Sequence, residues 1–219
     1  MNDAIGQGGA KLGRFRRACT LALMFATIGS LAAEGRFVVA AECVVATVNP
    51  LATDAGLEAF AKGGNAIDAA VAAALTLGVV DNHNSGIGGG CFILIRTAED
   101  EVAAIDGRET APAAATRNMF LRNGTAVPQL SQTGPLAVGV PGALAAYAIA
   151  VDDYGRRSLA DLLVPAAQIA ESGFAIDSVY AARLSATAKK LALFEGSRRA
   201  LLDANGEPFR EGDLLRQPD

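Results

Sequence analysis

Two opposite charges, Arg108 and Glu109, stand at the end of an apolar run in the segment IDGRETAP, residues 105–112. Side chains of a strand alternate between its faces, so the two are expected to point to opposite sides of a sheet. A guanidinium held by a rigid strand can bind a carboxylate through two parallel hydrogen bonds. The same residues could equally form a structural ion pair. The residues alone leave both interpretations open.

The segment NHNSGIGGGCFILI, residues 82–95, is rich in glycine. A dinucleotide-binding G-x-G-x-x-G loop would need glycines at 86, 88 and 91 and should follow a strand and open a helix, but position 91 is Cys91. A Walker-type loop fails because no Gly-Lys-Ser/Thr follows. The glycines are instead expected to permit a close backbone crossing or to hold positive φ angles.

His83 and Ser85 lie too close in sequence to be paired as a hydrolase dyad on chain position alone, and the chain has no G-x-S-x-G elbow. A lone histidine in a loop is more often a structural residue that makes hydrogen bonds. Because His83 is the single histidine and no Cys/His spacing pattern occurs, we expect no metal site.

The elements that position these groups begin with a strand-like segment, residues 37–48. A helix is predicted to start at Pro50 after an Asn49 N-cap and to end at Gly63, the position of a left-handed C-cap. The next helix starts at Asn65, and Asp68 three residues later has the spacing of a capping box. This second helix is apolar on every side and should be buried all round.

A β-hairpin is predicted over residues 91–109, and Arg108 lies at its end. Further helices are expected over residues 142–153, 158–172 and 177–193, with Pro165 breaking the middle one, and a turn over residues 203–208. Residues 211–219 show no clear terminal element. Antiparallel strands covered by helices, an α+β fold, fit this order better than repeated βαβ units.

The N-terminal residues have the layout of a secretory signal peptide. Four cations, from Lys11 to Arg17, precede an apolar run over residues 18–28, which is short for a membrane span. Small residues around Ala32 then favour cleavage, so we assign residues 1–32 to a signal peptide and residues 33–219 to the mature chain. An uncleaved N-terminal anchor is the alternative.

Cleavage would remove four cations and one anion, leaving 15 Lys and Arg against 22 Asp and Glu, a net charge of −7. This balance argues against a nucleic acid or an anionic membrane surface as partner. Cys43 and Cys91 remain and could pair in an exported protein, although two cysteines form no disulfide framework. Cys91 is better explained as a small buried hydrophobic residue.

Four successive blocks resemble the γ-glutamyltransferase (glutathione hydrolase) family in order and in residues. They cover most of the chain from Ala46 onward: residues 49–95 (NPLATDAGLEAFAKGG through GIGGGCFILI), 105–120 (IDGRETAPAAATRNMF), 134–147 (GPLAVGVPGALAAY) and 162–174 (LLVPAAQIAESGF). The resemblance implies an N-terminal-nucleophile hydrolase with an αββα four-layer sandwich, of which this chain holds the N-terminal part of the large subunit.

Members of that family are made as a precursor that cleaves itself into a large and a small subunit. The resemblance implies a threonine at the new N-terminus of the small subunit, which attacks the γ-glutamyl carbonyl with its own α-amino group as base. The glutamyl group of glutathione or another γ-glutamyl amide then passes to water, an amino acid or a peptide. No cofactor is needed, and an exported, periplasmic or extracellular enzyme is implied.

One functional residue carries over by its place in the motif. Arg108 matches the family arginine that binds the α-carboxylate of the γ-glutamyl group, and Glu109 matches its neighbour, expected to be a structural partner. The sequence contains no Thr-Thr pair, so the nucleophile segment is missing and the chain alone is expected to be inactive. The alternatives are a non-catalytic exported scaffold or pseudogene product, and a fragment of a related amide acylase.

Overall fold

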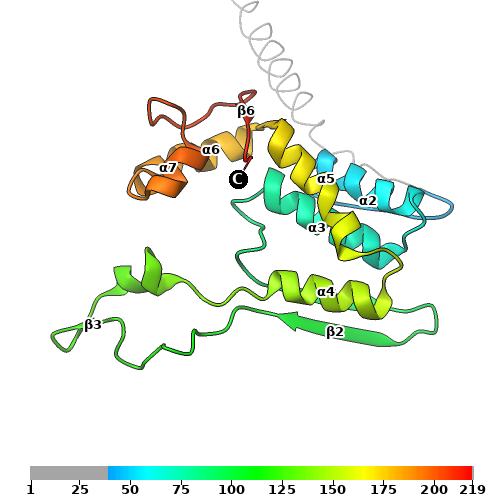
Figure 1. Ribbon diagram of the computed structural model, residues 1–219, viewed down its shortest axis with the longest axis horizontal. Helices are drawn as coiled ribbons and strands as arrows, with labels where there is room; N and C mark the ends of the chain where they lie inside the picture. The colour runs from blue at the N-terminus through cyan, green and yellow to red at the C-terminus, as the bar shows by residue number, and fades with distance from the viewer. Residues whose placement is uncertain (1–38, 219) are drawn as a thin grey trace, which may run out of the picture. The chain divides into compact units, whose positions relative to one another are not determined.

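The computed structural model describes residues 39–218, and the predicted signal peptide lies outside the described residues (Figure 1). The chain divides into two units, residues 1–41 and 42–219. The few described residues of the first unit contain no helix or strand. All elements below belong to the second unit. Among residues 39–218, no helix is both long enough and apolar enough to cross a membrane.

Three helices pack side by side: α2 (Pro50–Ala61), α3 (Ala66–Val80) and α5 (Leu159–Ser172) (Figure 1). The Asn49 side chain accepts a hydrogen bond from the Leu51 N–H at 3.0 Å, and Gly63 follows α2 with φ +85°. Both caps are confirmed. The capping box that opens α3 is also confirmed, because the Asp68 carboxylate accepts from the Asn65 N–H at 2.7 Å.

The predicted hairpin consists of β1 (Cys91–Arg96) and β2 (Val102–Gly107), paired antiparallel with Cys91 opposite Gly107. Helix α4 (Ala143–Tyr154) packs along this hairpin (Figure 1). Strand alternation buries Ile95 and half-buries Ile93, while the opposite face is exposed. Phe92, Leu94 and Val102 on that outer face are 65% to 77% exposed.

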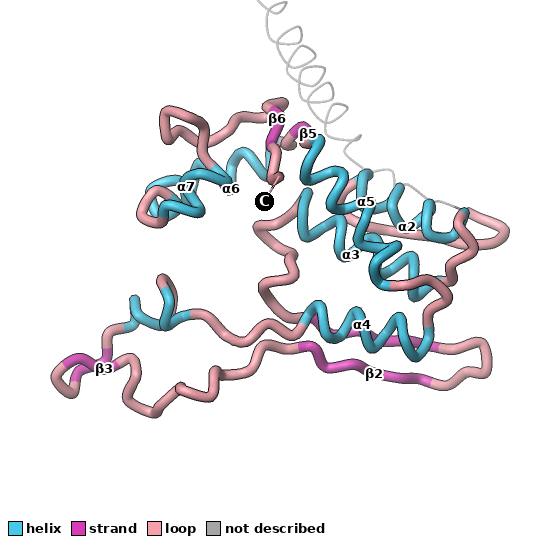
Figure 2. The backbone as a smooth tube through the Cα atoms, in the orientation of Figure 1, coloured by secondary structure: helices cyan, strands magenta, loops and turns pink. Residues whose placement is uncertain are grey.

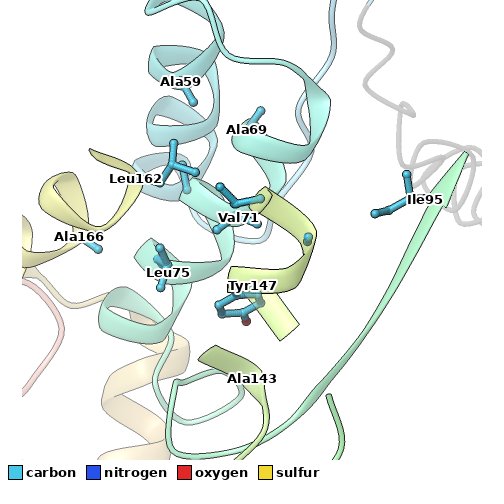
Figure 3. Packing of buried hydrophobic residues seen from close by; sticks show 12 residues of the cluster. Ala59, Ala69, Val71, Leu75, Ile95, Ala143, Tyr147, Leu162 and Ala166 are labelled. Carbon is cyan, nitrogen blue, oxygen red and sulfur yellow. The ribbon is translucent and has the colours of Figure 1, made fainter. Parts of the chain in front are cut away.

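The main core lies among α3, α4, α5 and the inner face of the hairpin (Figure 3). It is made mostly of alanine, valine and leucine, and small side chains let the helices approach closely. Helix α3 is buried along most of its length, as predicted, except at Ala66 and Ala70 near its start.

A second cluster of buried residues holds α6 (Ser178–Leu191) against a short sheet of β5 (Phe174–Ala175) and β6 (Leu214–Leu215). Helix α7 (Glu195–Leu201) follows α6. The remaining elements lie in the long connection between β2 and α4: the hairpin β3 (Leu121–Arg122) and β4 (Thr125–Ala126), and the 3-10 turns η1 (Pro128–Ser131) and η2 (Pro135–Ala137) (Figure 2). The fold is α+β with antiparallel strands, as the element order predicts.

Three expectations about elements are wrong. The described part of residues 37–48 is irregular, because it has no strand partner among residues 39–218, and Val45 packs on the core instead. Helix α5 continues through Pro165, because only one backbone hydrogen bond is lost while Leu162 and Ala166 on either side stay buried. The C-terminal segment contains the strand β6. A strand of only two residues within a polar segment gives no clear sequence pattern.

Candidate functional site

Arg108 and Glu109 follow directly after the last residue of β2, where the regular strand has ended. The Arg108 N–H donates to Asp106 Oδ1 at 2.9 Å and bends the backbone. Strand alternation therefore no longer applies, and the expectation that the two charges point to opposite faces is wrong. Arg108 Nε lies 3.7 Å from Glu109 Oε2, with the side chains 70% and 39% exposed.

An ion pair of this length and exposure contributes roughly 0–1 kcal/mol to stability. Among residues 39–218 the Arg108 guanidinium has no other ion-pair partner and donates no hydrogen bond. Most of its five N–H donors are therefore available to a ligand. The guanidinium is therefore available to bind an anionic ligand, in addition to its contact with Glu109.

The glycine run, defined as residues 86–90, makes room for Glu109. A Cβ on Gly90 would lie 2.7 Å from Glu109 Oε2 and 2.7 Å from the Gly107 carbonyl oxygen. A Cβ on Gly89 would lie 3.3 Å from Glu109 Oε1. The prediction of a close backbone crossing is thus confirmed, whereas no residue of the run has a positive φ.

The crossing is formed by the glycine run and residues 107–109, and a third segment, residues 139–143, packs against it. The Gly142 and Ala143 N–H groups at the start of α4 both donate to the Gly89 carbonyl oxygen at 3.1 Å. The first N–H groups of a helix lack intrahelical partners, so the glycine run satisfies two of them. The crossing fixes the end of the hairpin, and with it Arg108, to α4.

A hollow of about 990 Å³ lies beside the crossing. Its lining includes the glycine run, Cys91 and Glu109 on one side and residues of α6 on the other. Arg108 itself does not line the hollow, but its Cα would be 2.9 Å from a Cβ on the lining residue Gly90. Arg108 therefore stands at the border of a space large enough for a small-molecule ligand.

His83 also lines the hollow and is 15% exposed. Its ring meets the Tyr180 ring edge-on, with centroids 5.3 Å apart. Nε2 lies 3.1 Å from Asp81 Oδ1, yet neither ring nitrogen completes a hydrogen bond with a described residue. A packing role is thus observed for His83, but the hydrogen bonds expected of a structural histidine are not.

Burial alters the acidity of three groups beside the hollow. It raises the pKa of Tyr180 to about 12, and the Tyr180 hydroxyl donates a hydrogen bond to Asn82 Oδ1 at 2.8 Å. Burial also raises the pKa of the Cys91 thiol and of Tyr147, which are hydrogen-bonded to each other. A thiol with a raised pKa is a poor nucleophile, so Cys91 is not an activated group.

Cys91 and Cys43 are both free thiols in the structure. Among residues 39–218, no group of three or more His, Cys, Asp or Glu side chains gathers in a way that could hold a metal ion. Arg108, Glu109 and the backbone surface of the glycine run lie together at this site.

The sequence interpretation did not connect the glycine run with Glu109, nor residues 139–143 with either. The sequence signal that could have indicated the contact of residues 139–143 is the pair of glycines in VGVPGAL, immediately before a helix. The sequence interpretation also assigned no role to Arg183, which lines the hollow from α6. Helical spacing relative to the buried Tyr180 and Leu184 could have placed Arg183 beside the buried face.

The chain is similar to known proteins in sequence and in backbone. The family model described as Gamma-glutamyltranspeptidase matches residues 52–219. The chain is 46% identical over 182 residues to the glutathione hydrolase proenzyme of Bacillus subtilis (strain 168), covering 80% of this chain and 30% of that protein. The chain belongs to the gamma-glutamyltranspeptidase family, whose members are N-terminal-nucleophile hydrolases.

Two solved structures are similar in backbone as well. Gamma-glutamyltranspeptidase of Helicobacter pylori has a TM-score of 0.80 and 38% identity, with 83% of this chain and 52% of that chain covered. Cephalosporin acylase from Bacillus halodurans has a TM-score of 0.70 and 29% identity, with 84% and 36% covered. The chain spans about 30% of the length of the curated relatives it matches.

Proposed function

We propose that this chain provides the γ-glutamyl-binding part of an enzyme that transfers the γ-glutamyl group of glutathione or another γ-glutamyl amide to water, an amino acid or a peptide. The observation that carries the proposal is the Arg108 guanidinium, fixed at the end of a hairpin and largely without partners among residues 39–218. The family of the chain and the glutathione hydrolase names of its relatives support the substrate class.

Arg108 binds the α-carboxylate of the γ-glutamyl group through two parallel N–H···O bonds. Glu109 lies beside the guanidinium, with Oε2 3.7 Å from Nε, and the glycine run leaves room for the Glu109 carboxylate. A planar guanidinium positioned in this way orients the whole glutamyl group, so that its γ-carbonyl is presented at a defined point.

The nucleophile comes from the part of the relatives that this chain does not cover. In the proposed reaction the threonine Oγ forms a bond to the γ-carbonyl carbon while its proton passes to the α-amino group of the same threonine. The amine of the donor then leaves with that proton. Water or an acceptor amine breaks the resulting ester and regenerates the threonine.

A small subunit from the same precursor is the proposed partner. The outer face of the β1–β2 hairpin carries the exposed apolar side chains Phe92, Leu94 and Val102, and such a face is stabilised by a second layer. The proenzyme names of the relatives agree with a precursor that is cleaved. The signal peptide predicted for residues 1–32 supports an assembled enzyme outside the cytoplasm.

A related amide acylase is the second candidate function, because cephalosporin acylase from Bacillus halodurans shares the backbone over 84% of this chain. Both functions use an amide substrate and differ in what the acyl group carries. A γ-glutamyl donor needs a cation for its α-carboxylate, and Arg108 supplies one, so the γ-glutamyl function is preferred.

The experiment joins residues 33–219 to the remaining sequence of the Bacillus subtilis relative and follows release of a chromogenic amine from a γ-glutamyl amide. We expect turnover by the joined protein and none by residues 33–219 alone. Turnover by residues 33–219 alone would contradict the placement of the nucleophile. Hydrolysis of a cephalosporin side chain in preference to the γ-glutamyl amide would favour the acylase.

A further inference from the structure

The hollow has a second wall, which the proposed function leaves without a role. Arg183, Thr187 and Leu191 succeed one another at helical spacing along α6, and all three line the hollow. Residues three and four apart lie on one face of a helix, so this wall is a continuous strip of α6. It faces the glycine run and Glu109, which line the same space.

The backbone of this wall is fixed relative to the glycine run. Tyr180 is 2% exposed, and its hydroxyl donates to Asn82 Oδ1 at 2.8 Å. Its ring also meets His83 and Phe174 edge-on, with centroid distances of 5.3 and 5.9 Å. Because α6 is anchored one turn before Arg183, the backbone of Arg183 is held in a defined position beside the hollow.

The charges of the hollow are arranged for a ligand with two unlike ends. Of the described residues that line it, Arg183 is the one arginine or lysine and Glu109 the one carboxylate. Arg183 forms no ion pair with a described carboxylate, and its side chain is exposed to the solvent in the hollow. An unpaired guanidinium on the wall opposite a carboxylate matches a molecule with a carboxylate at its far end.

We propose that Arg183 binds the C-terminal carboxylate of a peptide-like γ-glutamyl donor, so that the hollow holds the part of the donor beyond the γ-amide. The inference rests on the proposed function, because Arg108 defines where the glutamyl end lies. Arg183 is then a specificity-determining residue: it distinguishes γ-glutamyl peptides, which end in a carboxylate, from simple γ-glutamyl amides, which do not.

The test measures binding to residues 33–219 by isothermal titration calorimetry with two probes. One probe is S-methylglutathione, and the other is its C-terminal glycinamide, which lacks only the terminal charge. We expect the acid to bind about tenfold more tightly than the amide, the effect of one hydrogen-bonded charge at a partly exposed site. Arg183→Gln should abolish this preference by weakening the acid alone.

Two variants separate the possible failures. Arg108→Gln should weaken both probes by the same factor, because it acts on the end that the probes share. Lys189→Gln removes one positive charge from the same helix outside the hollow and should leave the preference intact. Circular dichroism checks that each variant keeps the helical content of the unsubstituted chain.

Equal affinity for acid and amide, or a preference that survives Arg183→Gln, would overturn the role of Arg183 and leave that of Arg108 standing. Absence of binding by both probes would overturn the glutamyl site and this inference together. Loss of the preference in the Lys189→Gln variant would show a general charge effect and would likewise overturn the inference.

Discussion

Asp68 is fully buried and connects two parts of the fold that lie far apart in sequence. Its carboxylate accepts the Asn65 N–H at 2.7 Å within the capping box of α3. It also accepts the Arg156 N–H at 3.0 Å and the Arg157 N–H at 3.1 Å, both from the connection between α4 and α5. Replacing Asp68 by alanine therefore removes the acceptor of three backbone donors.

The magnitude follows from these three bonds. A hydrogen bond to a charged group contributes about 1.5–3 kcal/mol, and a buried donor left without a partner costs about 1–3 kcal/mol. Arg156 is exposed, so water can replace the carboxylate there, and the lower values apply. We expect Asp68→Ala to lower the free energy of unfolding by about 3–5 kcal/mol and the melting temperature by about 10 °C.

Urea unfolding of residues 33–219, followed by circular dichroism at the helical band, measures this change. Ser158→Ala is the matched control, because Ser158 caps α5 with one exposed hydrogen bond to the Asp161 N–H at 3.1 Å. Its expected cost is about 1 kcal/mol. A loss of less than about 1 kcal/mol in Asp68→Ala would refute the account of Asp68 as the link between α3 and the α4–α5 connection.

Two further predictions concern the crossing and the hollow. Gly90→Ala should cost about 1–3 kcal/mol in urea unfolding, because the new Cβ would lie 2.7 Å from a backbone oxygen, whereas Gly88→Ala, with nothing within 4 Å, should cost less than about 1 kcal/mol; equal costs would contradict the crossing. Burial raises the pKa of Tyr180 to about 12, so its stabilising contribution is complete below the unfolded-state pKa of about 10 and is lost as the pH rises to about 12. Urea unfolding at several pH values should show the difference between the chain and Tyr180→Phe shrinking over that window, and a constant difference would exclude the effect.

The sequence predicted the parts of the fold that local chemistry determines. Helix α2 begins at its Asn49 cap and ends before Gly63, and α3 begins with the Asn65 capping box, because each side chain acts on backbone groups a few residues away. The β1–β2 hairpin is likewise a contact between neighbouring segments. These elements carry the glycine run and Arg108, so the position of the arginine at the end of a strand was predictable.

Elements that depend on distant partners were not predictable in the same way. The valine-rich segment of residues 37–48 has the composition of a strand, but a strand needs a neighbour, and the described part has none. Conversely, β5 and β6 pair although Ala175 and Leu214 are 39 positions apart. Each strand has too short an apolar stretch to be recognised in the sequence. Pro165 stays inside α5 because tertiary burial on both sides outweighs one missing hydrogen bond.

The same distinction between local features and features that depend on distant segments applies to the candidate site. Arg108 could be named from its motif, whereas its closeness to Glu109 depends on the strand ending at Gly107, which the sequence does not mark. Residues 139–143 reach the site because they cross the glycine run, which lies about 50 residues earlier in the sequence. The wall formed by α6 depends on the packing of Tyr180 against residues about 100 positions earlier.

The Michaelis constant for a γ-glutamyl amide, measured on residues 33–219 joined to the remaining sequence of the Bacillus subtilis relative, tests the central claim most directly. Lysine keeps the charge of Arg108 but cannot make two parallel hydrogen bonds. Arg108→Lys is therefore predicted to raise KM by about tenfold while kcat changes little, because the lost contact is made in both the ground state and the transition state. An unchanged KM would remove Arg108 from the γ-glutamyl site.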